Sequence, residues 1–119
     1  MIRRLSLMLV ILLCTAVVQA GDASQSVVMQ TGRMQTPRAC HTASALADGR
    51  VLVAGGIDSN ENALNTAELY DPTSGTFTPT GDMLEGRSCA QAVTLPDGDV
   101  LIFGGWGART PIASIERYN

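Results

Sequence analysis

The sequence contains no lysine, and its eight basic side chains are all arginines, set against eleven carboxylates. Two of them, Arg3 and Arg4, stand at the start of the chain; without these, six arginines face the eleven acids, a net charge near −5. Binding nucleic acid or an anionic membrane through a general positive field requires a basic patch, which this balance disfavours. With 119 residues, the chain is long enough for one domain at most.

Histidine is almost absent, since His41 is the only one. A zinc or copper site needs several nitrogen or sulfur ligands, and no second histidine exists to complete such a site. A polar loop contains oxygen-bearing side chains, but their spacing matches no calcium-binding loop; they are Asp58, Asn60, Glu61 and Asn62. We therefore expect no metal and no cofactor, and a structural hydrogen-bonding role for His41.

The sequence also lacks an apolar run long enough to span a membrane as a helix. The longest run covers residues 5–18, and a spanning helix needs roughly 18 to 20 residues. It follows the basic start, and small or modest side chains precede Gly21, as in a secretory signal peptide. We expect residues 1–20 to be a signal peptide cleaved after Ala20, and residues 21–119 to work in the periplasm or outside the cell, where disulfides are permitted.

An internal repeat occupies most of the remaining chain. Residues 31–56 align with residues 80–105 at an offset of 49, and thirteen of the 26 aligned positions are identical. A fixed period of this length is the signature of repeated structural units. We expect units at about 31–80 and 80–119, preceded by one strand at 27–31 that aligns with residues 76–80.

Each unit has the pattern of short antiparallel strands, and no segment has helical periodicity with caps. Asp48-Gly49 and Asp97-Gly98 separate apolar runs and favour tight hairpin turns. The strands expected in the first unit are 40–46, 51–54, 66–70 and 76–80, and those in the second are 89–95, 100–103 and 114–118. The first strand of each unit is rich in small residues, which suits a place where neighbouring sheets converge.

These residues carry a resemblance to the kelch motif. The first unit has the pair Gly55-Gly56 after an apolar strand, then Tyr70 and then the aromatic residue Phe77; the second has Gly104-Gly105 and Tyr118. The likeness covers residues 26–119 and is closest to bacterial exported kelch proteins, although Phe77 stands where the family usually has Trp. It implies an all-β fold: a segment of a kelch-type β-propeller with about two four-stranded antiparallel blades.

Two blades do not complete a propeller, because a closed ring contains roughly four to eight. Repeat units also cannot bury their faces alone. Either the chain is part of a longer protein, which we favour, or several copies assemble into a ring. The expected partners are thus further blades of a longer chain or further copies of this one.

Antiparallel order places the loops before the first strand and after the second strand of each unit on one face. In kelch proteins of known activity ligands commonly dock there, so the resemblance directs attention to Arg38, Arg87, Trp106 and Arg109. The indole of Trp106 could stack on a sugar, or pack over a neighbouring blade. The recurring arginines Arg38 and Arg87 could grip an anion, but their recurrence favours a structural role, bridging blades through loop carbonyls.

The expected function is that of an exported binding or scaffold module for a glycan, peptide or protein ligand. The resemblance leaves two alternatives, a sugar-modifying enzyme similar to the sialic acid mutarotases and an inactive fragment. Catalysis on a sugar needs an acid and base pair, and Asp58, Glu61 and Glu85 are too loosely placed to supply one. The chain has too few copper ligands to be a copper oxidase like galactose oxidase, because His41 is its only histidine. No catalytic residue is assigned, and the chain is not expected to be an enzyme.

Cys40 and Cys89 occupy equivalent positions in the two units. Stacked sheets lie about 10 Å apart, whereas the Cα atoms of a disulfide rarely lie more than roughly 7 Å apart. The two thiols could meet only near the axis of the propeller. We therefore expect two free, buried thiols rather than a disulfide.

Overall fold

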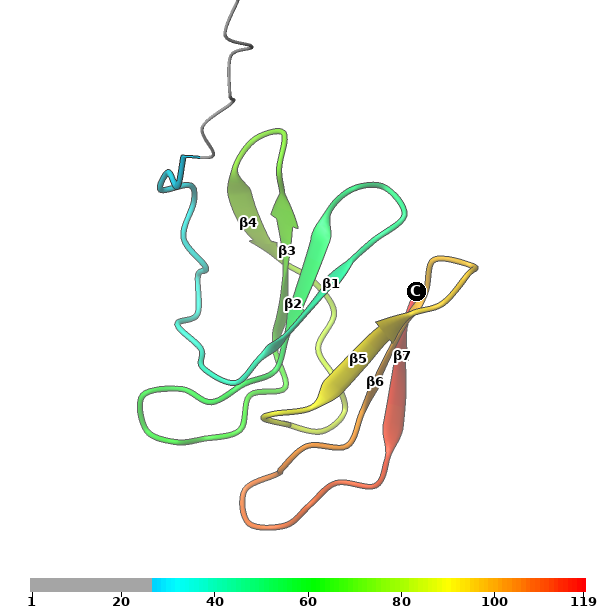
Figure 1. Cartoon of the computed structure of the whole chain (residues 1–119). Helices are drawn as coiled ribbons and strands as arrows, with labels where there is room; N and C mark the ends of the chain where they lie inside the picture. Colours follow the sequence, from blue (N-terminus) through cyan, green and yellow to red (C-terminus); the bar gives the residue numbers. More distant parts are fainter. Residues whose placement is uncertain (1–26) are drawn as a thin grey trace, which may run out of the picture.

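The computed structural model describes residues 27–119, which form two antiparallel sheets and no helix. The expected signal peptide, residues 1–20, lies outside the described residues. The all-β architecture confirms the fold class expected from the sequence, a pair of propeller blades (Figure 1). The strands are β1 (Thr42–Ala45), β2 (Val51–Ala54), β3 (Ala67–Asp71), β4 (Thr76–Pro79), β5 (Gln91–Thr94), β6 (Val100–Phe103) and β7 (Ile115–Tyr118).

The first sheet has the order β1-β2-β3-β4, so that each strand pairs with its neighbour in the chain. Its β1–β2 hairpin turns at Gly49, whose φ of 89° only glycine adopts readily. The carboxylate of Asp48 accepts a hydrogen bond from the backbone N–H of Arg50 at 3.0 Å and steadies this turn. The Asp-Gly pair therefore has the hairpin role that the sequence indicates.

The second sheet has the order β5-β6-β7 and repeats this arrangement with three strands. Its Asp97-Gly98 turn has a φ of 95° at the glycine. Within residues 27–119 no strand pairs with the outer edge of β7. Residues 27–31, which were expected to form an eighth strand, form no strand in the structure. Lone strands are not stable, and no strand of a preceding sheet lies beside this segment to bond with it.

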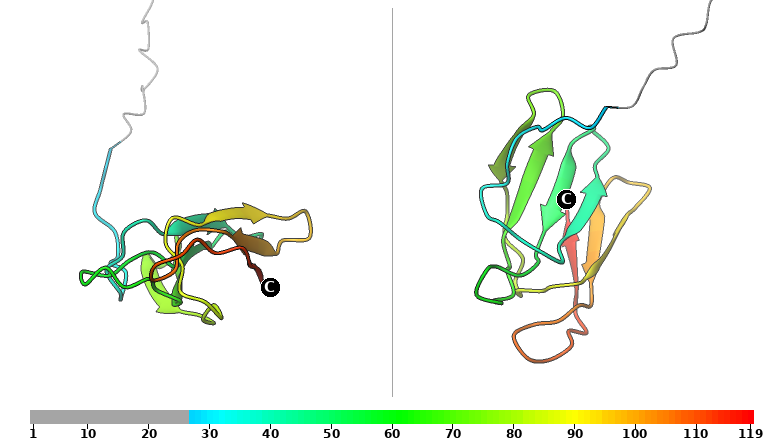
Figure 2. Two further views of the ribbon diagram at one scale, coloured as in Figure 1. Left: turned by 90° about the horizontal axis from the view of Figure 1, so that it is seen from below. Right: turned by 60° about the vertical axis from the view of Figure 1, so that its left-hand side comes forward.

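The two sheets pack against each other like adjoining wedges (Figure 2). The first sheet contributes Leu52, Ala54, Ala67 and Leu69 to the shared core, and the second contributes Val100 and Ile102 together with Ala90 just before β5. Met83, from the connection between the sheets, completes this cluster. The small residues of β1 and β5 lie where the sheets converge, and these two strands contact each other across the interface.

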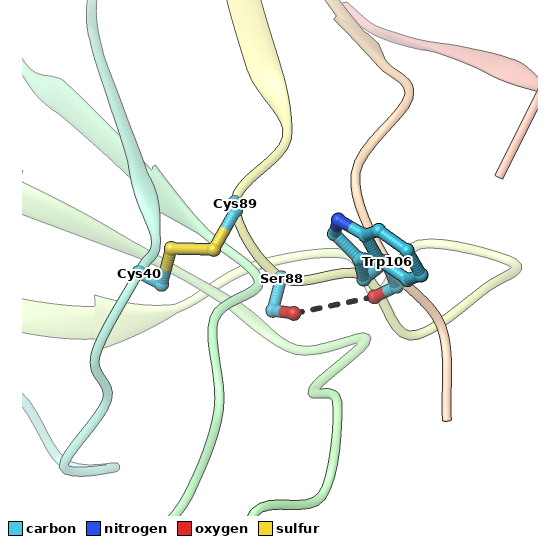
Figure 3. Close-up of a disulfide and its surroundings, with 4 residues drawn as sticks. All are labelled: Cys40, Ser88, Cys89 and Trp106. Carbon is cyan, nitrogen blue, oxygen red and sulfur yellow. Dashed lines mark hydrogen bonds between the residues drawn. A yellow bond between two sulfur atoms is a disulfide. The ribbon is translucent and has the colours of Figure 1, made fainter. Parts of the chain in front are cut away.

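A disulfide joins Cys40 to Cys89 across the two sheets, so the prediction of free thiols is wrong (Figure 3). The cysteines precede β1 and β5, at the converging edge, where their Cα atoms lie 4.8 Å apart. The spacing of stacked sheets applies to their faces, not to the edge where they meet. Both cysteines have positive φ, 53° and 51°, and the N–H of Cys89 donates to the carbonyl oxygen of Cys40 at 2.7 Å.

The described residues contain no helix that is both long and apolar enough to cross a membrane. Along the same stretch, no three side chains of the metal-binding types cluster as a metal site. His41 is exposed at the start of the first sheet.

Candidate binding face

Three loops meet at one end of the two sheets and enclose a cleft. They are the β2–β3 loop, the β4–β5 connection and the β6–β7 loop, which lie together at the lower end in Figure 1. The cleft has a volume of about 480 Å³ and is lined by Glu61, Asn62, Ala63, Gly86, Ala108 and Arg109. The expectation that these loops share one face is confirmed, because all three contribute to one cleft.

Trp106 begins the β6–β7 loop and has a fixed backbone with an exposed side chain. Its N–H donates to the carbonyl oxygen of Ser88 at 2.8 Å, and its own carbonyl oxygen accepts from the Ser88 N–H at 2.9 Å. The Ser88 hydroxyl donates to the same Trp106 oxygen at 3.3 Å (Figure 3). The side chain is nevertheless 54% exposed. An anchored backbone with an accessible indole presents a flat apolar surface at little entropic cost.

The equivalent position in the first sheet shows how Trp106 differs from a purely structural residue. Ile57 makes the same two backbone bonds with Ala39, at 2.8 and 3.0 Å, and its side chain is half-buried. The backbone arrangement therefore needs no aromatic residue. Packing within the described residues does not account for the indole.

The cleft itself combines charges of both signs. Arg109 and Glu61, both exposed, are among the residues that line it.

The loop that contains Glu61 is held in a fixed conformation. Glu61 has a φ of 64°, a left-handed conformation that is uncommon for a residue with a side chain. A neighbouring carboxylate holds this loop, because Asp58 accepts hydrogen bonds from the N–H groups of Asn60 and Asn62 at 2.8 and 2.9 Å. The side-chain amide and the N–H of Asn62 lower the pKa of Asp58, so its oxygens stay ionised and engaged in the turn.

Arg38 and Arg87 have structural positions instead. Both are buried, at 8% and 1% exposure. Arg38 donates from Nη1 to the carbonyl oxygens of Gly55 and Thr66, both at 2.9 Å, and from Nη2 to Glu68 at 2.8 Å. Each guanidinium thus ties the end of the second strand of its sheet to the start of the third.

The second sheet repeats this arrangement. Arg87 donates from Nη1 to the carbonyl oxygens of Gly104 and Ser114, at 3.1 and 3.0 Å, and from Nη2 to Glu116 at 2.8 Å. Its Nε is buried without a hydrogen-bond partner. This geometry agrees with the bridging of loop carbonyls that recurrence favours, although the bonds run within each sheet. We therefore remove Arg38 and Arg87 from the candidate ligand set and keep Trp106 and Arg109.

The partners of these arginines, Glu68 and Glu116, were not singled out from the sequence. Glu68 is 2% exposed, and its carboxylate also accepts from the N–H groups of Gln35 and Thr36 at 2.7 and 3.0 Å. Glu116 accepts from the N–H groups of Leu84 and Glu85 in the same way. The signal in the sequence is a glutamate that recurs at the same place in the third strand of each unit, where a buried charge requires a partner.

Burial raises the pKa of Glu68, but the N–H donors and Arg38 outweigh it, so the pKa lies below its ordinary value of 4.5. Burial likewise raises the pKa of Glu116, and the Leu84 N–H, Arg87 and the Glu85 N–H lower it further than burial raises it. Both carboxylates are therefore ionised at neutral pH. Each carboxylate binds the segment that leads into its sheet, residues 35–36 for Glu68 and residues 84–85 for Glu116.

The three carboxylates considered for catalysis are not arranged as an acid and base pair. Asp58 is engaged in its turn, and Glu85 bonds with Ser114 and Arg87. Glu61 lines the cleft together with Arg109. No feature of the described residues favours chemistry on a sugar over binding.

The fold defines the class, two antiparallel sheets that correspond to blades of a β-propeller. The family model of the kelch motif matches residues 37–84, one complete repeat, which supports a kelch-repeat protein. No curated protein matches the chain. Gly55, Gly56, Tyr70 and Phe77 all lie inside the matched range, and Tyr70 packs on Phe77 with ring centroids 4.8 Å apart.

Proposed function

We propose that this chain is a binding module that takes a glycan or peptide ligand on the face formed by its β2–β3 and β6–β7 loops. The kelch motif suggests a protein-binding or scaffold repeat in general terms. The observation that carries the more specific proposal is Trp106, more than half exposed on an anchored backbone, in the loop whose Arg109 lines the cleft.

The chemistry of this face suits a polar ligand with one flat apolar surface. The indole offers a stacking face for a sugar ring or an aromatic side chain. The guanidinium of Arg109 can bond a carboxylate or sulfate in bidentate fashion. Glu61 and Asn62 add acceptors and a donor on the opposite wall.

The test compares wild type, Trp106→Ala and Ile57→Ala on a glycan array and on a peptide array. Ile57 is the matched control because it has the same backbone bonds without the exposed indole. We expect a ligand bound by wild type to be retained by Ile57→Ala and weakened about tenfold or more by Trp106→Ala, as for an aromatic contact at the centre of an interface. Equal signals from wild type and Trp106→Ala would remove Trp106 from the proposed site.

We also propose that the protein is exported and works in an oxidising compartment. The order of charges and apolar residues over positions 1–20 supports this, and so does the disulfide, since structural disulfides are rare where thiols are kept reduced. Intact mass of the protein from its native host should show a chain that begins at Gly21 and lacks the two thiol hydrogens. A chain that begins at Met1 would contradict the proposal.

A further inference from the structure

The β2–β3 and β6–β7 loops, which both line the cleft, are closed by the same backbone hydrogen bond. In the first loop the N–H of Asp58 donates to the carbonyl oxygen of Asn62, the residue after Glu61, at 3.1 Å. In the second loop the N–H of Gly107 donates to the carbonyl oxygen of the residue after Arg109, at 2.9 Å. Glu61 and Arg109 therefore occupy equivalent places at the two loop tips, and they carry opposite charges.

The repeat distinguishes side chains that the fold requires from side chains that it does not. Where a side chain holds the backbone the residue recurs, since Arg38 and Arg87 bond equivalent carbonyl groups of their sheets. At the loop tips an acid is replaced by a base, although the closing hydrogen bond is the same. Closure of the loops therefore does not account for the charges of Glu61 and Arg109.

Both charged side chains are available to another molecule. Each is exposed, and neither forms an ion pair or a side-chain hydrogen bond within residues 27–119. Glu61 in addition has its left-handed φ of 64° at a place that glycine would occupy more easily. Backbone strain of this kind is typical of positions that contact a ligand.

The cleft between these loop tips has room for a ligand and a fixed base. Its volume of about 480 Å³ is in the range of ligand sites, and its lining includes the small residues Ala63, Gly86 and Ala108. A Cβ at Gly86 would lie 2.4 Å from the carbonyl oxygen of Ala63, so the backbones of the two segments are in close contact. The N–H of Arg87 also donates to the carbonyl oxygen of Leu64 at 3.1 Å. The β2–β3 loop is thereby held against the β4–β5 connection.

We propose that the cleft binds a peptide segment with charges of both signs, placing an acidic side chain on Arg109 and a basic side chain on Glu61. This inference rests on the proposed function and selects between its two ligand classes. The common sugars supply hydroxyls, amides and carboxylates but no cation, so a glycan matches Arg109 and leaves Glu61 without an opposite charge. A peptide supplies both charges, and charges across a specific interface are complementary.

The test begins with selection from a phage-displayed library of random-sequence peptides on the full wild-type chain at physiological ionic strength. We expect the selected peptides to contain both acidic and basic residues. Their affinity should fall about tenfold or more in Glu61→Arg and in Arg109→Glu, because each reversal brings like charges together. Asp82→Arg and Arg33→Glu are the matched controls, since both residues are exposed and neither lines the cleft. These should change the affinity by no more than about twofold, because distant charges are screened.

Reversing the charge on both partners then assigns each contact. A selected peptide whose acidic residue is replaced by lysine should bind Arg109→Glu several-fold more tightly than it binds wild type. A peptide whose basic residue is replaced by glutamate should likewise prefer Glu61→Arg. Such compensation arises only between groups that interact, so it separates direct contact from a general effect of net charge. Equal affinity of the original peptide for wild type and for either reversal variant overturns the proposal.

Trp106→Ala distinguishes failure of this inference from failure of the proposed function. A peptide that is lost in Trp106→Ala but bound equally by both reversal variants keeps the proposed binding face and overturns the charge assignment. Glycans bound by wild type, with no peptide selected, overturn the peptide class and leave a glycan-binding face. If wild type binds neither peptides nor glycans, the inference and the proposed function fail together.

Discussion

At the residue scale, the repeated ion pairs of Arg38 with Glu68 and Arg87 with Glu116 organise each sheet. Each joins the chain that enters a sheet to the strands of that sheet through several short hydrogen bonds. A buried charge pair contributes little net stability compared with apolar residues of the same volume. Removing one member, however, leaves the other as a buried charge without a partner, which strongly destabilises the fold.

Replacement of Arg38 by alanine is therefore expected to destabilise the protein by about 3 to 5 kcal/mol, the cost of leaving a buried carboxylate without its cation. The measurement is urea denaturation followed by circular dichroism. Arg33→Ala is the matched control, because Arg33 is exposed and its loss should change the free energy of unfolding by no more than about 0.5 kcal/mol. Similar effects of the two substitutions would show that the buried bonds are unimportant for stability.

The lowered pKa values of Glu68 and Glu116 predict lability in acid. In the unfolded chain these groups protonate near their ordinary pKa of 4.5, and in the folded chain they protonate at lower pH. Their contribution to stability is thus complete above the unfolded pKa and is lost as pH falls through the folded pKa. The melting temperature should decline as pH is lowered below about 4.5. In Glu68→Gln this decline should be shallower, and an unchanged slope would contradict the assignment.

At the element scale, the glycine pairs that follow β2 and β6 let two segments of backbone approach closely. Gly56 has a φ of 99°, and a Cβ at this position would lie 2.5 Å from the carbonyl oxygen of Ala39. That oxygen also accepts the N–H of Ile57 at 2.8 Å. The second glycine is needed both for its backbone conformation and for the bridge that anchors the loop face.

Gly56→Ala is accordingly expected to destabilise the protein by at least about 1 to 2 kcal/mol, the cost of left-handed backbone for a residue with a side chain, with the close contact added. Gly81→Ala is the control, because a Cβ there meets nothing within 4 Å. Thermal melting compares the two variants. A loss of stability at Gly81 as large as that at Gly56 would refute the proposed role of the close contact.

The sequence predicts the elements well where one local signal determines them. The bounds of β2 and β6 agree with prediction, since an apolar run flanked by Asp-Gly and Gly-Gly leaves little freedom. The first strand of each unit begins later than expected, at Thr42 and Gln91, because the cysteines have left-handed backbone that cannot enter a strand. Residues 27–31 form no strand because strand formation depends on a partner, which no local pattern specifies.

The same distinction holds for the candidate site. Trp106 and Arg109 could be located from their place in a loop between strands, whereas the burial of Arg38 and Arg87 depends on carbonyl groups 17 to 28 residues further along the chain. The disulfide was missed for a related reason. Two packed sheets are far apart at their faces but close together at the edge where they converge. Which of these distances separates the two cysteines depends on how the sheets pack, and a local sequence pattern does not specify this.

At the scale of the whole molecule, the two sheets are joined by one small core, by the disulfide and by hydrogen bonds. The N–H of Cys89 donates to the carbonyl oxygen of Cys40, the N–H of Gly56 donates to that of Arg87, and the hydroxyl of Thr94 donates to that of Ala45. The bridge closes a loop with a sequence separation of 49 residues. Closing a loop of that length restricts the unfolded chain by about 4 kcal/mol in the chain-entropy description. This is large beside the stability of a domain of this size.

Reduction should therefore lower the free energy of unfolding of the oxidised protein by up to about 4 kcal/mol, with the sheets loosening from each other first because each keeps its own hydrogen bonds. Urea denaturation with and without reductant measures the loss, and intact mass confirms the redox state. The double variant Cys40→Ala/Cys89→Ala is the control: it should resemble the reduced wild type and show no response to reductant. Equal stability of oxidised and reduced wild type would mean that the shared core and the hydrogen bonds between the sheets hold them together without the disulfide.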